Sequence, residues 1–142
     1  MKAQVGPDTI CHALTARKHA RRLARLYDRH LAPTGLSISQ FSILSRLRAR
    51  KRIKIAELAD ILVMERTSLV RALKPLQTAG WVVAEASEQG RSLELVLSPS
   101  GLKKLSEALP LWQEAQVAFE RAVGRERAVG LRKEIYELNQ TA

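Results

Sequence analysis

The stretch IAELADILVMERTSLVRALKPLQTAG, residues 55–80, decides the fold. Its apolar residues recur at the three- and four-residue spacing of a helix, first over 55–62 and again over 66–79, with residues 63–65 as a tight connection. The residues predicted to face a core are Leu58, Ala59, Leu62, Leu69, Ala72, Leu73 and Leu76. Gly80 follows the second helix directly, at the position where a glycine in the left-handed conformation commonly ends a helix. The stretch therefore predicts two helices joined by a short turn, a helix-turn-helix unit.

The residues that follow predict a β-hairpin. Residues 81–84 (WVVA) have the composition of a strand, and residues 91–97 alternate between polar and apolar side chains, as a returning strand does. A polar tip with one glycine, residues 85–90, separates the two strands.

Long helices are predicted on both sides of this unit. Ser98-Pro99 predicts a helix start, because a capping hydroxyl precedes a proline at the first helical position. That helix is expected to run to about residue 123 with a kink at Pro110, and a last helix follows over about 125–139. Upstream, a helix over 8–31 is capped by Asp8, a second opens at one of two serines, 37 or 39, and ends near 49, and a basic link covers 50–54.

This order of elements predicts a mainly α fold with a two-stranded β wing. A chain of 142 residues is long enough for one core, and neither a repeat nor a long linker divides it. We expect a single domain over 1–142, with a winged helix-turn-helix over 37–98, a wing at about 85–92, and flanking helices over 8–31 and 99–140.

The charge of the chain predicts a polyanionic partner. Lys and Arg number 24 against 14 Asp and Glu, which gives +10 and an isoelectric point near 10.5. Residues 1–60 carry 13 basic and four acidic side chains, whereas residues 61–142 carry 11 and 10. The excess is therefore concentrated in the first part of the chain, as in proteins that bind nucleic acid.

The second helix of the 55–80 stretch carries side chains suited to reading DNA. A helix fits the major groove, and residues near its N-terminus face the base edges. Thr67 and Ser68 can bond bases or phosphates, and Arg71 stands one turn beyond Thr67, within reach of a guanine. The predicted contacts on this helix are Arg66, Thr67, Ser68, Val70, Arg71 and Lys74. The alternative is an ordinary helical hairpin inside a core.

Further residues extend the predicted contact set. Arg91 stands beside a glycine at the hairpin tip, where an arginine can enter a narrow minor groove; the alternative is a solvated loop residue. Phosphate contacts are predicted from Ser39, Arg66 and the basic link around Lys51–Lys54, Lys54 included. Such contacts contribute most of the affinity and make it depend on salt.

From about Leu36 to Leu105 the sequence resembles the MarR family of winged-helix transcription regulators. LSISQF at 36–41 resembles the start of the family's second helix, IAELAD at 55–60 its first helix-turn-helix helix, and RTSLVR at 66–71, with Leu76 and Gly80, its recognition helix and stop. The residues that fit the family's wing pattern are Arg91, Leu95, Leu97, Ser98 and Gly101.

The resemblance implies a homodimer in which the helices over 8–31 and 99–140 form the dimerisation part. Two winged helices would then bind a pseudo-palindromic operator. It also implies a ligand-responsive repressor, whose small anionic or aromatic effector binds between the dimerisation and DNA-binding parts and weakens the affinity for DNA. The residues predicted to line the effector pocket are Arg21, Arg25, Tyr27, His30, Phe41 and Trp112.

Three positions depart from the family pattern. Gln89 replaces the acid that precedes the wing arginine by two residues, so either Arg91 is less ordered or Glu88 takes that role. Val63 replaces a small residue in the turn of the helix-turn-helix. Pro75 lies inside the predicted recognition helix and removes an amide, which predicts a bend near 71–75.

The N-terminal helix carries a cationic stripe formed by Arg17, Arg21, Arg25 and Arg29, with Lys18 and Arg22 beside it. Like charges in a row repel one another. The stripe is either a solvated face paired with glutamates of the C-terminal helices, or a site for an anionic effector or extra phosphate contacts.

Cys11 near the start of this helix is the candidate redox residue, because a helix N-terminus lowers the pKa of a thiol. The MarR family includes an organic-peroxide-sensing branch with a helix-1 cysteine and partner tyrosines. Tyr27 matches one of these tyrosines, whereas Cys11 lies about two residues early and Ile38 stands where a second tyrosine would be. Thiol-based regulation is therefore one alternative, and a packed, inert cysteine is the other.

Other classes of function find little support in the sequence. It shows no Gly-rich phosphate loop and no nucleophile–base arrangement, so we expect neither an enzyme nor a cofactor. One cysteine and three histidines do not form a metal site, and no apolar run is long enough to span a membrane, so a cytoplasmic protein is expected. The remaining alternative is a winged-helix module that binds an acidic protein partner.

Overall fold

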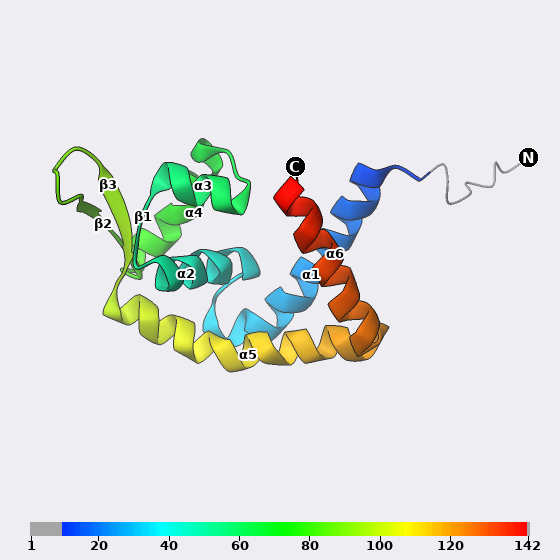
Figure 1. Ribbon diagram of the computed structural model, residues 1–142. Helices are drawn as coiled ribbons and strands as arrows, with labels where there is room; N and C mark the ends of the chain where they lie inside the picture. The colour runs from blue at the N-terminus through cyan, green and yellow to red at the C-terminus, as the bar shows by residue number, and fades with distance from the viewer. Residues whose placement is uncertain (1–9, 142) are drawn as a thin grey trace, which may run out of the picture.

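The computed structural model describes residues 10–141, which form helices around a small antiparallel sheet. The elements follow in the order α1 (His12–Leu31), η2 (Ala32–Thr34, a 3-10 helix), α2 (Ile38–Arg50), β1 (Arg52–Lys54), α3 (Ile55–Leu62), α4 (Arg66–Thr78), β2 (Val82–Ala86), β3 (Leu93–Leu97), α5 (Pro99–Val123) and α6 (Arg125–Thr141). Figure 1 shows two parts: the sheet with α2, α3 and α4, and a second part made by α1 and α6, with α5 running along the base of both.

The first helices begin and end at local signals in the sequence. α1 begins at His12 with Cys11 as its N-cap residue, and the predicted cap Asp8 lies outside the described residues. Gly35, at φ +76°, ends η2. Ser37 then caps α2: its hydroxyl accepts from the Gln40 amide at 3.1 Å, and the Gln40 side chain accepts from the Ser37 amide at 3.0 Å. This reciprocal pair selects Ser37 over Ser39 as the start of the helix.

The helix-turn-helix unit is confirmed almost to the residue, with α3 over 55–62 and α4 over 66–78. Val63, in the turn, adopts the left-handed conformation with φ 52° and ψ 48° and is 87% exposed. A β-branched residue is strained there, since its Cβ crowds the backbone. α4 continues through Pro75, so the proline does not end the helix.

The sheet has one more strand than the predicted two-stranded wing. Part of the basic link forms β1, which pairs with β3 so that Ile53 lies opposite Leu95. β2 pairs with the other edge of β3, and the strand order is β1-β3-β2. β1 is not predictable from the sequence, because a single buried Ile53 between two exposed cations gives too short a pattern to recognise. The hairpin tip covers residues 87–92, two residues later than its predicted start at Glu85.

A single core joins the two parts of the molecule. Leu44 and Leu47 belong to α2, which packs against α1, α5 and β3, and both are fully buried. The residues of this core include Leu31, Leu36, Phe41, Ile53, Leu58, Leu69, Leu73, Leu76, Val82, Leu95, Leu105 and Ala108. Leu62 and Ala72, predicted to face inward, are partly buried against the same cluster.

The start of α5 is fastened to the end of the helix-turn-helix unit. The Ser98 hydroxyl accepts from the Gly101 amide at 3.0 Å and donates to the Gly80 carbonyl at 2.5 Å. Gly101 is buried, and a Cβ at this position would clash with the Trp81 carbonyl oxygen and approach Leu97 Cδ1 to 2.7 Å. Pro110 lies within α5 without ending it, and Gly124, at φ +92°, separates α5 from α6. In the described part of the chain, no helix is long and apolar enough to cross a membrane.

Replacing Gly101 by alanine is expected to lower the free energy of unfolding by about 1–3 kcal/mol, because the added methyl group overpacks the junction of α5 with β2. Gly130 provides the matched control: it lies in α6 with open space around its Cα, so Gly130→Ala is expected to raise stability by about 0.5–1 kcal/mol. Urea unfolding followed by circular dichroism measures both. Equal effects of the two variants would contradict the tight contact.

Candidate nucleic-acid interface

One face of α4 is polar, cationic and open to solvent. The six predicted contact residues of this helix, Arg66, Thr67, Ser68, Val70, Arg71 and Lys74, are all exposed. Five of them line one shallow hollow, and Ser68 is the member that does not. The opposite face carries Leu69, Leu73 and Leu76, which are buried in the core. The buried face thus fixes which side chains the helix presents.

The cations on this face are available for a ligand. Within residues 10–141, none of Arg66, Arg71 and Lys74 forms an ion pair. The first turn of α4 contains no acidic residue, and the helix dipole places partial positive charge there. The N-terminal half of α4 therefore attracts an anionic surface.

The hairpin presents Arg91 at the end of a tight turn. The Ser87 amide donates to the Ser92 carbonyl at 2.8 Å, and the Gly90 amide donates to the Ser87 carbonyl at 2.8 Å, with Gly90 at φ +69°. Arg91 is exposed, and the described residues show no ion pair between it and Glu88. Glu88 therefore does not take the place of the acid that the family pattern has where this chain has Gln89.

Arg52 holds the hairpin in place, a role that the sequence analysis missed. From β1 its guanidinium reaches across β3: Nη1 lies 2.8 Å from Glu85 Oε2, Nη2 donates to the Ala86 carbonyl at 3.2 Å, and Nε lies 3.7 Å from Glu94 Oε2. In the sequence, Arg52 is one of several cations in a basic link. The pairing of β1 with β3 is what places it opposite two acids. These three contacts fix both hairpin strands to β1.

The other predicted phosphate contacts are accessible. Lys54 is exposed at the junction of β1 and α3, and Ser39 is exposed in the first turn of α2. Because Ser37 caps α2, the Ser39 side chain does not serve as the cap. Lys51 is exposed at the C-cap of α2 with φ 65°. Arg52 alone of this basic segment is committed to the ion pairs of the wing.

The structure does not bring the six predicted effector residues into one pocket. Phe41 and Trp112 stack with ring centroids 5.7 Å apart and pack in the core cluster. Arg21 and Arg25 are exposed on α1. His30 bonds to the Leu26 carbonyl at 2.9 Å and lines a separate hollow beside Pro110. The prediction grouped residues by the family pattern, which does not specify the rotation of each side chain about its helix.

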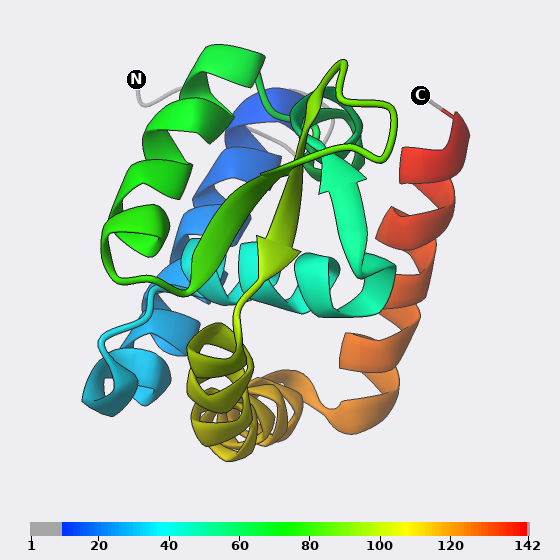
Figure 2. The ribbon, with the colours of Figure 1, turned by 90° about the vertical axis from the view of Figure 1, so that its left-hand side faces the viewer.

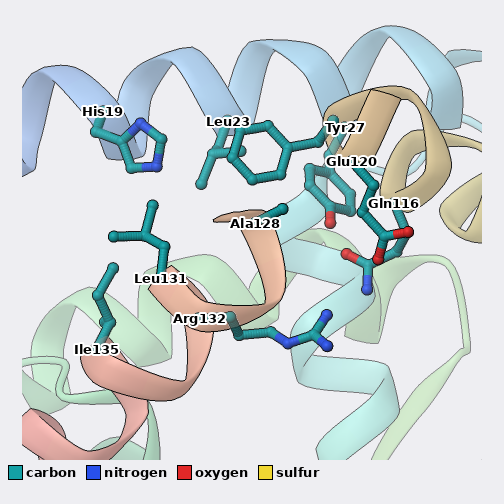
Figure 3. Close-up of a pocket in the computed structure, with 10 residues that line it drawn as sticks. His19, Leu23, Tyr27, Gln116, Glu120, Ala128, Leu131, Arg132 and Ile135 are labelled. Carbon is teal, nitrogen blue, oxygen red and sulfur yellow. The ribbon is translucent and has the colours of Figure 1, made fainter. Parts of the chain in front are cut away.

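Tyr27 lines a different hollow, of about 230 Å³, between α1, α5 and α6. Figure 3 shows its hydroxyl near Gln116, Glu120 and Arg132 at one end, whereas His19 and Ile135 lie at the other. Burial raises the pKa of the Tyr27 phenol from its ordinary value, and the positive charge of Arg132 partly offsets this rise. The Tyr27 hydroxyl therefore stays protonated at neutral pH.

Cys11 is exposed at the N-cap of α1 and is far from the tyrosine on the same helix. Sixteen residues separate it from Tyr27, which corresponds to about 24 Å of helical rise. One chain therefore does not bring this thiol and this phenol together. Among the residues that the structure describes, no three His, Cys, Asp or Glu side chains are grouped to bind a metal ion.

Comparison with known proteins agrees with this geometry. Residues 34–92 match the family model of the MarR family. The uncharacterized HTH-type transcriptional regulator YwoH of Bacillus subtilis (strain 168) is 33% identical over 88 residues, which is 62% of this chain and 64% of that protein. The chain thus aligns with somewhat less than two thirds of this relative's length.

Two solved structures extend the similarity to almost the whole chain. The crystal structure of the M. tuberculosis transcriptional regulator MosR in complex with DNA is 33% identical, with a TM-score of 0.79 over 93% of this chain and 96% of that one. The transcriptional repressor CouR, bound to a 23-mer DNA duplex, shares the fold at 23% identity, with a TM-score of 0.84 over 97% and 99%. These relatives are transcription regulators and not enzymes, and the chain belongs to the MarR family of winged-helix transcription regulators.

Proposed function

We propose that this chain binds double-stranded DNA in a sequence-specific manner and acts as a homodimeric transcriptional repressor on a pseudo-palindromic operator. The observation that carries the proposal is the exposed cationic face of α4, turned outward by its buried leucines and accompanied by a wing arginine. A helix with such a face fits the major groove, and the wing reaches the adjacent minor groove.

Each part of this surface has a distinct task in the proposed complex. Arg71 reads base edges, since an arginine can bond the O6 and N7 of a guanine together. Arg66, Lys54 and Ser39 contact phosphates and fix the register of the protein on the duplex. Arg91 enters the minor groove, where the negative potential of AT-rich sequence is strongest.

The terminal helices favour a second copy of the chain as the dimer partner. They expose an unusual number of large apolar side chains, and monomeric proteins seldom expose such a surface without a partner. The residues are Leu14, Leu102, Val117, Val123, Val129, Leu131, Ile135, Tyr136 and Leu138, and Ile10 lies just before α1. A symmetric dimer would place two α4 helices about one helical turn of DNA apart.

Control by a small anionic or aromatic effector belongs to the same proposal. The hollow at Tyr27 offers an apolar wall beside a phenol, a carboxylate and a guanidinium. Because it lies among the helices that would join two copies, a ligand there would alter the spacing of the two α4 helices. Oxidation of Cys11 remains the alternative signal, and its exposure makes the thiol accessible to an oxidant.

The experiment that tests the function measures the fluorescence anisotropy of a labelled duplex taken from upstream of the chain's own coding region. A scrambled duplex is the control, and light scattering gives the mass of the free protein and of the complex. A preference of about a thousandfold for the native duplex, with two chains bound to it, is the expected result. Equal, weak binding to both duplexes would instead favour the protein-interaction module.

Arg71→Ala is expected to weaken binding to the preferred duplex by about 1–3 kcal/mol and to relax the preference at one base pair. The reason is that a truncated side chain leaves the guanine edge without its donors. Binding measurements over a set of single-base-pair variants of the duplex detect the change. An unaltered preference at every position would remove Arg71 from the reading set.

Arg52→Gln is expected to weaken DNA binding about two- to fivefold, because exposed ion pairs contribute about 0.2–1 kcal/mol and this one positions the wing. The effect should disappear in an Arg91→Ala background if the clamp acts through the wing arginine. Arg50→Gln is the matched control, since Arg50 pairs with Glu57 at 3.4 Å, away from the hairpin. Additive losses in the Arg52–Arg91 double variant would contradict this role.

A further inference from the structure

The cationic stripe of α1 has no counter-charge in the described part of the chain. Arg17, Lys18, Arg21, Arg22, Arg25 and Arg29 are all exposed. Among residues 10–141, none of them forms an ion pair. The one acid of α1, Asp28, instead accepts a hydrogen bond from the Ile38 amide at 2.8 Å. Four arginines at a spacing of four residues repel one another, so this face is destabilised until an anion covers it.

The arginines point away from the acids of their own chain. His19, Leu23 and Tyr27 line the hollow against α5 and α6. Each follows an arginine of the stripe by two residues, which is a rotation of about 200° around the helix. Glu120 of α5 lies on the side of that hollow. The stripe therefore faces the side opposite to the packed face of α1.

The terminal helices of a second copy would offer the stripe no excess of negative charge. Residues 99–141, which form α5 and α6, carry seven basic and six acidic side chains. These helices have no surplus of carboxylates with which to neutralise six cations on a partner's α1. This balance of charge favours an anion from a different kind of molecule over a second copy of the chain.

The placement of α1 relates the stripe to the proposed DNA-binding face. Figures 1 and 2 share a vertical axis, and in both views the N-terminus of α1, the N-terminus of α4 and the tip of the β2–β3 hairpin lie toward the top of the molecule. Arg17 and Arg21 belong to the N-terminal half of α1. A duplex resting on α4 and the wing would pass this end of the stripe.

We propose that the stripe is a second contact surface for the phosphate backbone of the same duplex, with Arg17 and Arg21 making the contacts. A duplex carries about one phosphate charge per 1.7 Å, which is enough to match arginines that recur about every 6 Å along the helix. The contact carries no sequence information and adds affinity that depends on salt. This inference rests on the proposed DNA binding and extends the contact surface from the winged helix to a terminal helix.

The double variant Arg17→Gln, Arg21→Gln tests it. Each lost phosphate contact lowers the slope of log affinity against log salt by about 0.9, so the slope should fall by about 1.8. Between 50 and 200 mM salt, the factor by which affinity falls should then be about ten times smaller for the variant than for the wild type. The ranking of preferred duplexes should not change.

Arg125→Gln, Arg127→Gln is the matched control. Both arginines are exposed at the start of α6, which Figure 1 places at the opposite, lower end of the molecule, and the change in net charge is identical. Its salt slope should equal that of the wild type. Hydroxyl-radical footprinting adds a second readout, in which only the first variant loses backbone protection outside the sites covered by α4 and the wing.

Several results would overturn the proposal. An unchanged salt slope in the Arg17, Arg21 variant would contradict the phosphate contacts. The same loss of slope in both double variants would also contradict them, because it would show that the net charge of the protein, and not the stripe, sets the slope. Weaker dimerisation of the first variant in light scattering would assign the stripe to the second copy. Thermal unfolding checks the fold, and Arg21→Gln alone, with an expected loss of about 0.9 in slope, keeps the test open should the double variant not fold. A wild-type protein that binds no duplex would contradict the proposed function itself.

Discussion

The burial of three leucines on one side of α4 determines which side chains this helix exposes to solvent. Leu69, Leu73 and Leu76 are 0%, 1% and 0% exposed. A helix has only one rotation that places three such residues in a core, and that rotation turns Arg66, Arg71 and Lys74 outward. The side chains of α4 that are proposed to bind DNA are thus positioned by buried residues on the opposite face of the helix. The rest of the core, from Leu31 to Ala108, serves to keep that rotation fixed.

Patterns that repeat along the chain were predictable, and contacts between distant segments were not. The helix-turn-helix was predictable because its apolar spacing and its stop at Gly80 are local signals, and the Ser98-Pro99 cap predicted the start of α5 in the same way. β1 was not, since a three-residue strand is defined by its partner across the sheet and not by its own composition. The clamp formed by Arg52 depends on this same pairing and was missed with it.

The predicted effector pocket shows a similar limit. Tyr27 was recognised as a pocket residue, but Phe41 and Trp112 stack in the core and Arg21 points to solvent. The six predicted residues come from α1, α2 and α5, and a pocket requires that the side chains of all three helices turn toward one space. Arg132 and Glu120 line the same hollow as Tyr27 because α6 packs against α1 and α5. No local pattern in the sequence specifies this packing.

The fastening of α5 to the Gly80–Trp81 corner has a mechanical consequence. The Ser98 hydrogen bonds and the close packing at Gly101 hold the first turn of α5 against the winged helix, so a tilt of α5 is expected to carry the winged helix with it. The helix has 25 residues and is therefore about 37 Å long. A tilt of about 5° at its far end corresponds to a displacement of about 3 Å, the length of one hydrogen bond. In the proposed DNA complex α5 would therefore act as a lever, because a small rearrangement among the terminal helices would be large enough to separate α4 from a base edge.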